Sequence, residues 1–240
     1  MIYISVCIAT YNGEKFIAEQ LESILSQELP VDEIIISDDS STDRTVEIIK
    51  SYSDFRITLL ENNNFRSPIF NFENALKHAT GAVVFLSDQD DIWSPSKVRV
   101  MSEYLRHYDL VISDASLIDS SCCVVEDSFY KLRNSGPGFL KNLYKNSYLG
   151  CCMAFNKNIL DKSLPFPVNI PMHDMWLGMI ANFSGKTLFC KEKLVYYRRH
   201  SSNASPTGGK SCYKFIDMIA FRYNLLTALI KRYFLNKPRI

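Results

Sequence analysis

The sequence lacks any apolar run long enough to cross a membrane. A spanning helix needs about 18 or more consecutive apolar residues, and polar or charged residues interrupt every hydrophobic segment before that length. The first residues also lack the basic stretch, the longer apolar region and the small-residue cleavage site of a secretory signal. These absences predict a cytoplasmic protein without a membrane-spanning segment.

None of the 7 cysteines has the spacing of a zinc site. Two adjacent pairs occur, Cys122-Cys123 and Cys151-Cys152, but there is no C-x-x-C pair and no matching histidine spacing. An odd number of cysteines without a secretory signal predicts reduced thiols, as in the cytoplasm.

Neither sign of charge dominates, because 27 Lys and Arg face 26 Asp and Glu. Their distribution is uneven, however. Residues 210–240 contain seven basic residues and one aspartate, whereas the preceding residues contain 20 basic and 25 acidic ones. With 240 residues, 47% of them hydrophobic, the chain can bury the core of one large α/β domain or of a domain with an appendage, which excludes disordered and fibrous classes.

Up to about Asp114, short β-branched segments alternate with longer helical patterns. This alternation predicts a mostly parallel sheet covered by helices. The apolar stripe of Ile17, Leu21 and Ile24 predicts a core-facing helix between the first two strands, and a second stripe around Ile49 predicts another. The expected strands of this part are 2–9, 33–37, 57–61, 82–86 and 110–113. The stretch over 115–150 is less regular. After it we expect a helix over 173–183, a strand over 193–199 and a helix over 213–235.

Polar residues gather where three of these strands end. The first strand leads into residues 10–13, the second into residues 38–43, and the fourth into Asp88-Gln89-Asp90-Asp91. Because ligands of an open parallel sheet bind at the carboxyl ends of its strands, we expect these loops to meet at one edge.

The last of these loops carries three carboxylates within four residues. Such groups repel one another unless a cation lies among them, and Mg²⁺ or Mn²⁺ prefers carboxylate oxygens. The loop therefore predicts a divalent metal site for a diphosphate, with a solvated acidic turn as the alternative. In the second loop, Ser41, Thr42 or Asp43 could cap the following helix, and residues 10–13 could form only a tight turn.

With these loops in order, the chain resembles the family 2 glycosyltransferases of the GT-A fold. The likeness is strongest to bacterial enzymes of O-antigen and capsule synthesis, rhamnosyltransferases among them, that carry an Asp-Gln-Asp-Asp-Ile-Trp segment. The resemblance implies a GT-A catalytic domain over 1–205, with a nucleotide-sugar half over 1–114 and an acceptor half over 115–205, followed by a basic helical segment over 206–240. It covers about residues 2–200 and rests on Ala9-Thr10-Tyr11-Asn12-Gly13, residues 38–43, Ser87 to Asp91 and His173-Asp174.

The resemblance assigns the first two loops to the nucleotide. It implies that Thr10, Tyr11 and Asn12 line the nucleotide pocket together with Asp38. Asp39 would accept a hydrogen bond from the pyrimidine imide.

The third loop is assigned to ribose, metal and sugar. The resemblance implies that Asp88 holds the ribose and that Asp90 binds the Mn²⁺ or Mg²⁺ bridging the donor diphosphate. Asp91 would be a second ligand or would position the sugar. A metal at this place would stabilise the departing nucleoside diphosphate as a Lewis acid.

Asp174 resembles the family's catalytic base. In an inverting transfer, one carboxylate takes the proton from the acceptor hydroxyl as it attacks the anomeric carbon. His173 stands where many relatives have Glu or Asp, and the alternative is that the pair only starts a helix with Asp174 as its cap. His200 matches a position of a final metal ligand or diphosphate contact, with a surface histidine as the alternative. Arg198 and Arg199 could contact the diphosphate or form a solvated face.

These features predict a metal-dependent, inverting glycosyltransferase that uses a UDP- or dTDP-sugar. The chain lacks the Gln-x-x-Arg-Trp signature of processive synthases, which favours the addition of one sugar per encounter. The resemblance implies an acceptor saccharide linked to polyprenyl diphosphate, used at the inner face of the plasma membrane.

Two other classes of function compete with this one. Asp88-x-Asp90 resembles the nucleophile motif of haloacid-dehalogenase-like phosphohydrolases, but that motif follows the first strand and here three strands precede it. A non-catalytic nucleotide-sugar-binding module is the other alternative, and the intact carboxylates argue against it. Nucleic acid is not an expected partner, because the basic tail mixes with apolar residues and forms no phosphate-binding stripe.

The expected C-terminal helix is apolar on two sides and must therefore be covered twice. One stripe can dock on the catalytic domain. The other, accompanied by Lys214, Arg222 and Arg232, suits an anionic membrane surface or a partner subunit, and core packing alone is the simpler alternative. The stripes are Ile216, Ile219, Tyr223, Leu226, Ile230 and Phe234 on one side, and Met218, Phe221, Leu225 and Leu229 on the other.

Overall fold

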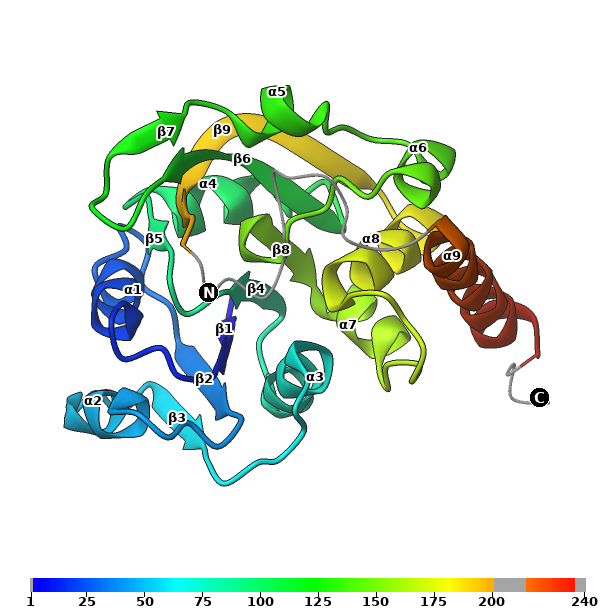
Figure 1. Ribbon diagram of the computed structural model, residues 1–240. Coiled ribbons are helices and arrows are strands. Elements are labelled where there is room, and N and C mark those ends of the chain that lie inside the picture. Colours follow the sequence, from blue (N-terminus) through cyan, green and yellow to red (C-terminus); the bar gives the residue numbers. More distant parts are fainter. Residues whose placement is uncertain (1, 201–214, 236–240) are drawn as a thin grey trace.

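The computed structural model describes residues 2–200 and 215–235, and its strands form one mixed sheet (Figure 1). Four parallel neighbours make up one half, in the order β3 (Ile57–Leu60), β2 (Glu33–Asp38), β1 (Ile4–Thr10) and β4 (Val83–Ser87). The other half continues through β8 (Met153–Asn156), β6 (Leu110–Ile118), β9 (Thr187–Arg198) and β5 (Ile92–Trp93), while β7 (Val124–Glu126) pairs with β6. Strand β8 runs antiparallel to both β4 and β6, and it joins the two halves.

The helices cover the sheet in the way that the apolar stripes predict. Helix α1 (Ile17–Leu25) buries Ile17, Leu21 and Ile24, and α2 (Thr45–Ser51) buries Ile49. Helix α3 (Pro68–His78), for which the sequence pattern set no bounds, packs against β1 and β2. Helix α4 (Lys97–Tyr104) follows β5 and packs against β6.

The stretch over 115–150 is more ordered than its sequence indicated. Strand β6 runs on to Ile118 and is buried throughout, although Asp114 lies in its middle. The Asp114 carboxylate accepts hydrogen bonds from Ser128 Oγ (2.5 Å) and Tyr130 N (2.9 Å), and so anchors the start of α5 (Phe129–Arg133). A charged residue thus sits inside a buried strand because the next helix supplies its donors. Helix α6 (Phe139–Tyr144) follows.

The last part of the chain forms helices beside the second half of the sheet. Helices α7 (Lys157–Ser163) and α8 (His173–Ser184) pack on each other, and α9 (Phe215–Ile230) lies beside α8, away from α1 and α2 (Figure 1). Helix α9 continues into a π-helix over Lys231–Leu235. Residues 201–214 and 236–240, including Lys214, lie outside the described residues.

One stripe of α9 docks and the other faces outward. Leu225 and Leu229 are buried, whereas Ile219, Tyr223 and Ile230 are exposed. In residues 2–200 and 215–235, no helix is both long and apolar enough to span a bilayer.

Arg222 and Arg232, which we expected to accompany the outward stripe, both donate to backbone carbonyls of the domain. Arg222 donates to the carbonyl of Tyr144, and Arg232 donates to the carbonyls of Lys162 (3.0 Å) and Leu164 (2.6 Å). The Arg232 guanidinium also lies 5.4 Å from the centre of the Trp176 ring. These arginines fix α9 on the domain through their hydrogen bonds to backbone carbonyls.

The order of the strands places the site. Strand β1 lies between β2 and β4, so the strand order reverses between β1 and β4. In open α/β sheets the ligand crevice lies outside the carboxyl ends of the strands at this point. The three polar loops of the sequence follow β1, β2 and β4, and they meet there.

Candidate active site

The first two loops are tied together by their own polar side chains. Asp38, at the end of β2, accepts hydrogen bonds from Thr10 Oγ1 (2.8 Å), Ser41 N (2.8 Å) and Ser41 Oγ (2.6 Å). Asn12 has a φ of 48°, and its Oδ1 accepts from Thr42 N at 2.8 Å. Asp38 is buried, and neither Asp38 nor Asn12 is among the residues that line the cavity described below. Both residues therefore act on the cavity by holding the loop that forms it.

The N-cap residue of α2 is Arg44, and Asp43 directly before it accepts hydrogen bonds at the start of the helix. Its Oδ1 accepts from Thr45 N (3.0 Å) at the start of α2, and its Oδ2 accepts from Glu14 N (3.1 Å). Partial burial would raise the pKa of the Asp43 carboxyl, but hydrogen bonds from the Thr45 hydroxyl and from these backbone groups outweigh it and lower the pKa. Asp43 thus satisfies a free donor of the helix end and also pins the loop after β1.

A cavity of about 760 Å³ opens where the loops meet. Asp39 lies in its wall, and its two oxygens accept from Phe65 N (2.6 Å) and Ser67 N (3.1 Å). Each carboxylate oxygen has a second lone pair, so a ligand donor can still bind Asp39. The lining residues are Ala9, Thr10, Tyr11, Asp39, Ser40, Asn64, Arg66, Ser67, Pro68, Asn71, Phe72, Asp88, Gln89, Asp90, Met172, His173 and Tyr197.

The three carboxylates after β4 are held close together. Burial, together with the charges of Asp90 and Asp174, raises the pKa of Asp88 to about 7. Burial also raises the pKa of Asp90, against the opposing effect of His200, and burial plus the other two carboxylates raises that of Asp91 well above its usual range. A cation among these groups would offset their repulsion and the loss of solvation.

Lys97, which the sequence analysis did not single out, provides part of this compensation. Its ammonium group is fully buried, donates to the carbonyl of Cys151 (2.6 Å) and lies 3.7 Å from the centre of the Trp93 ring. Burial lowers the pKa of Lys97 to about 8, while the neighbouring carboxylates Asp91 and Asp88 act in the opposite direction. In sequence, nothing distinguishes Lys97 from a surface lysine at the start of a helix.

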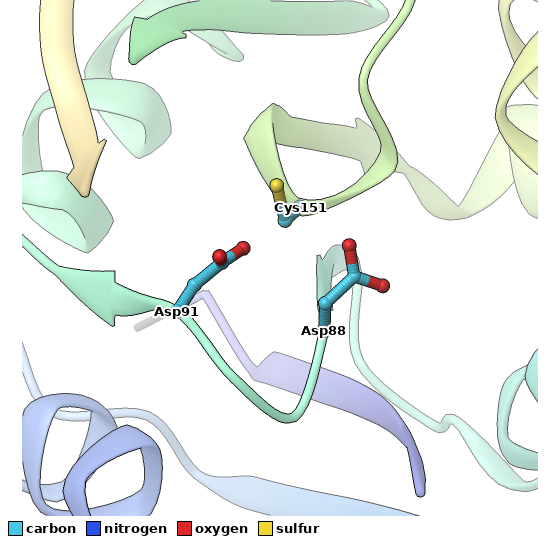
Figure 2. A group of neighbouring side chains, drawn as sticks. All are labelled: Asp88, Asp91 and Cys151. Atoms are coloured by element: carbon cyan, nitrogen blue, oxygen red, sulfur yellow. The ribbon is translucent and has the colours of Figure 1, made fainter. Parts of the chain in front are cut away.

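Two of the carboxylates face a thiol. Figure 2 shows Asp88 and Asp91 directed toward Cys151, and one ligand atom from each of the three lies within 4.8 Å of the others. Burial raises the pKa of the Cys151 thiol well above its usual range, so the thiol stays protonated. A protonated thiol is a poor ligand for Mg²⁺ or Mn²⁺. With its thiol protonated, this group offers either ion only the two carboxylates.

His200 reaches the acidic loop from the end of β9. Its Nε2 lies 2.8 Å from Asp90 Oδ2, and its ring packs 4.9 Å from that of Phe16. The imidazole nitrogen and the carboxylate oxygen are both ligand types that Mn²⁺ accepts. The structure thus brings together the two residues that the sequence predicted as metal ligands, and the donor set fits a divalent ion.

The interpretation of Arg198 as part of a solvated face is wrong. Its side chain is 1% exposed, donates from Nε to the carbonyl of Asp90 (2.8 Å) and forms an ion pair with Glu19. Its backbone N–H donates to Asp91 Oδ1 (2.9 Å). Arg198 is neither a solvated residue nor a lining residue of the cavity; it fixes the acidic loop against β9.

Asp174 lies in the first turn of α8, whose N-cap residue is Met172. Its Oδ1 accepts from Met175 N (2.5 Å), and Asn146 and the backbone of Gly150 also donate to its carboxylate. Burial raises the pKa of Asp174 to about 7. Asp174 does not line the cavity, whereas His173 does. Its donors Asn146 and Gly150 belong to the half of the chain predicted to bind the acceptor.

Comparisons with known proteins are consistent with this site. The family described as "Glycosyl transferase family 2" matches residues 5–164. The Escherichia coli UDP-Glc:alpha-D-GlcNAc-diphosphoundecaprenol beta-1,3-glucosyltransferase WfaP is 30% identical over 210 residues, 85% of this chain and 80% of its own length. The Bacillus subtilis (strain 168) protein named "Putative glycosyltransferase EpsE" is 37% identical over 114 residues, which are 45% of this chain and 41% of EpsE.

Solved structures confirm the predicted fold. The crystal structure of S. aureus TarS 1-349 in complex with UDP-GlcNAc matches with a TM-score of 0.70 at 21% identity. The match covers 98% of this chain and 74% of that one. The mixed α/β sheet is thus that of the GT-A fold.

Proposed function

The chain belongs to glycosyl transferase family 2, and on this premise we propose that it is a metal-dependent, inverting enzyme that transfers one sugar from a UDP- or dTDP-sugar. The observation that carries this proposal is one cavity with an acidic, histidine-paired loop in its wall, and the buried carboxylate of Asp174 directly after the lining residue His173. The name of the relative WfaP, which specifies UDP-Glc and a diphosphoundecaprenol-linked acceptor, supports a lipid-linked saccharide acceptor in bacterial surface polysaccharide synthesis.

Donor binding would use the three loops. Asp39 would accept from the base, Thr10 and Tyr11 would line the nucleotide pocket, and Asp88 would bind the ribose. Asn12 and Asp38 would contribute by holding the shape of the pocket.

The metal would be held by Asp90 and His200, and Asp91 would be a further ligand. When bound, Mn²⁺ or Mg²⁺ neutralises the charge that develops on the leaving diphosphate. Asp91 Oδ2 is buried and has no partner among the described side chains, so it can turn toward a cation. Lys97 and Arg198 keep the loop in place while the charge of the site changes.

Asp174 would accept the proton of the attacking hydroxyl. A general base works best when its pKa lies near the operating pH, and burial gives Asp174 a pKa of about 7. Burial also excludes bulk water from the carboxylate, which favours transfer to the acceptor over hydrolysis of the donor.

The two alternative functions have little support. Asp88 follows the fourth strand and lies in a shared cavity with the loops of β1 and β2, which is not the arrangement of a haloacid-dehalogenase-like phosphohydrolase. A non-catalytic module would need no buried carboxylate with a pKa near 7 beside the cavity.

The test is nucleoside diphosphate release by the purified chain with Mn²⁺ or Mg²⁺. A panel of UDP-, dTDP- and GDP-sugars would be used with and without a polyprenyl-diphosphate-linked acceptor. We expect release from one donor that stops with a chelator and with Asp90→Asn, and that persists in Asp161→Asn, a control carboxylate on the exposed side of α7. Release of monophosphate from simple phosphate esters, or donor turnover by Asp90→Asn, would contradict the proposal.

We further propose that the outward face of α9 holds the enzyme on the inner face of the plasma membrane. Ile219 and Tyr223 are 53% and 67% exposed, and Leu140 and Tyr144 on α6 are 76% and 79% exposed. The carbonyl of Tyr144 binds Arg222, so the two helices lie side by side. Exposed apolar side chains accompanied by lysines suit an anionic bilayer, and Lys141 and Lys145 are exposed around Tyr144.

Flotation with vesicles of phosphatidylglycerol would test the membrane contact. We expect the double variant Ile219→Ser and Tyr223→Ser to lose most binding, and Phe55→Ser to keep it, because Phe55 is 96% exposed but lies outside this face. Equal flotation of both variants, or loss of a dimer instead of loss of lipid binding, would favour a different occupant such as a second copy.

A further inference from the structure

The side chain of Gln89, in the middle of the acidic loop, binds the backbone of the loop after β1. Its Oε1 accepts a hydrogen bond from the backbone N–H of Tyr11 (2.9 Å), and its Nε2 donates to the carbonyl of the same residue (3.0 Å). A side-chain amide has an acceptor and a donor in one plane. It can therefore pair with both backbone groups of one residue, as a neighbouring antiparallel strand would.

Gly13 leaves the space that the Gln89 amide occupies. A methyl group at this position would lie 2.6 Å from Gln89 Cδ and closer still to its Oε1. Because carbon atoms that are not bonded to each other pack about 3.5 to 4.0 Å apart, a side chain at Gly13 would displace the amide from Tyr11. The φ of Gly13 lies outside the left-handed region. The contact with Gln89, and not a left-handed turn, is therefore what favours glycine here.

The first two loops form one unit that does not depend on the acidic loop. Hydrogen bonds to Asp38, Asn12 and Asp43 join them, as described above. In residues 2–200 and 215–235, the hydrogen bonds between residues 10–16 and residues 88–91 both come from the Gln89 side chain. Gln89 thus holds the acidic loop at a fixed distance from the unit formed by the first two loops.

Under the proposed function, a metal-bound nucleotide has to contact both parts at once. Its base would bind Asp39, and the metal on its diphosphate would bind Asp90. Both residues line the same cavity, as do Tyr11 and Gln89. A ligand that bridges two parts binds more tightly when their separation is already fixed, because less ordering accompanies binding. The metal alone, or the nucleotide without metal, depends less on this separation.

We propose that Gln89 is a positioning residue that couples nucleotide binding to metal binding. It holds the loop after β1 and the acidic loop at the separation that a metal-bound nucleoside diphosphate requires. This inference rests on the proposed function. Gln89 acts through Tyr11 and Asp90 and not on the reacting atoms. Without the amide, each loop keeps its own ligand groups, but the metal strengthens nucleotide binding less.

The test compares nucleotide binding by the full chain in a chelator and in saturating Mn²⁺, measured by calorimetry with UDP and dTDP. The quantity compared is the factor by which Mn²⁺ strengthens nucleotide binding. We expect Gln89→Ala to reduce this factor about tenfold, the equivalent of one to two hydrogen bonds. Nucleotide binding in the chelator and Mn²⁺ binding without nucleotide should each stay within about threefold. By linkage, the factor by which the nucleotide strengthens Mn²⁺ binding should fall equally.

Gly13→Ala provides a matched second variant, because it displaces the amide and leaves Gln89 in the chain. It should lower the same factor in the wild-type background by a similar amount. In the Gln89→Ala background it should have no further effect, since the added methyl group then meets no amide. Such a double-mutant cycle isolates the contact between the two residues. Additive losses would show that Gln89 and Gly13 act independently, and would overturn the proposal.

A purely structural role of Gln89 predicts a different result. Gln89→Ala would then weaken nucleotide binding equally in the chelator and in Mn²⁺, and the factor would not change. An unchanged factor overturns this inference and leaves the proposed function intact. If the wild type binds neither UDP nor dTDP in Mn²⁺, or if Mn²⁺ does not strengthen its nucleotide binding, the proposed function fails and this inference fails with it.

Discussion

Replacing Asp174 by asparagine should stabilise the protein while it removes activity. In the folded protein the pKa of Asp174 is raised from 3.8 to about 7, chiefly by burial. Each pKa unit corresponds to about 1.36 kcal/mol, so the charged carboxylate costs about 4 kcal/mol of folding free energy at pH 8. The backbone N–H groups and the Asn146 side chain that donate to Asp174 will not all suit an amide, which reduces the expected net gain to about 1 to 4 kcal/mol.

The sign of this effect depends on pH in a defined way. Because the folded-state pKa is raised, the stability contributed by Asp174 is complete below about pH 3.8, its unfolded value, and is lost as the pH rises through about 7. The asparagine variant has no such loss. Its advantage over the wild type should therefore be largest near pH 8 and shrink to less than about half at pH 5.

Urea unfolding at several pH values would measure this advantage. The buffers should contain a chelator, so that metal binding does not contribute, and Asp161→Asn serves as the control because Asp161 is an exposed carboxylate on α7. Donor turnover by Asp174→Asn should fall by about 10² to 10⁴. An advantage that does not change with pH, or a loss of stability at every pH, would refute the electrostatic reasoning. Retained turnover would refute the role as base.

Two further predictions concern the groups around the acidic loop. His200→Ala should weaken Mn²⁺ binding at least about tenfold, measured by calorimetry, whereas unchanged Mn²⁺ affinity would place His200 outside the metal site. Lys97→Met should lower the free energy of unfolding by about 3 to 5 kcal/mol, because Asp88 and Asp91 then lose a buried counter-charge. Lys157→Met, at an exposed ion pair on α7, should cost less than about 1 kcal/mol in the same urea titration. If both variants lost the same free energy of unfolding, the buried ammonium of Lys97 would stabilise the protein no more than an exposed one does.

The fold could be predicted from the sequence because the patterns that indicate it lie within short segments of the chain. The strand-and-helix alternation up to Asp114 and the polar loops after β1, β2 and β4 are short-range patterns, and parallel strands place such loops at one edge. The extent of β6 was missed because Asp114 interrupts its apolar pattern. The residues that satisfy Asp114 lie in α5, and that contact is not visible in a strand pattern.

The buried cations of the site were missed for a related reason. Lys97 and Arg198 have the residue types of a protein surface, and the sequence gives no measure of how far they are buried. Only the folded chain shows that Lys97 lies against Trp93 and that Arg198 spans from Glu19 to the Asp90 carbonyl. The contact of Gln89 with Gly13 is likewise a property of packing.

The pairing of Asp90 with His200 follows from a strand register. Strands β5 and β9 are antiparallel, with Ile92 opposite Tyr196 and Trp93 opposite Val195. Continuing this register past the end of β5 places Asp90 opposite Arg198, and Arg198 does bind the carbonyl of Asp90. His200 follows two residues later, on the same side of the extended chain as Arg198. A two-residue strand thus fixes the position of His200, the proposed metal ligand, which lies 110 residues from Asp90 in sequence, and a one-residue slip of β9 would turn the His200 ring away from Asp90.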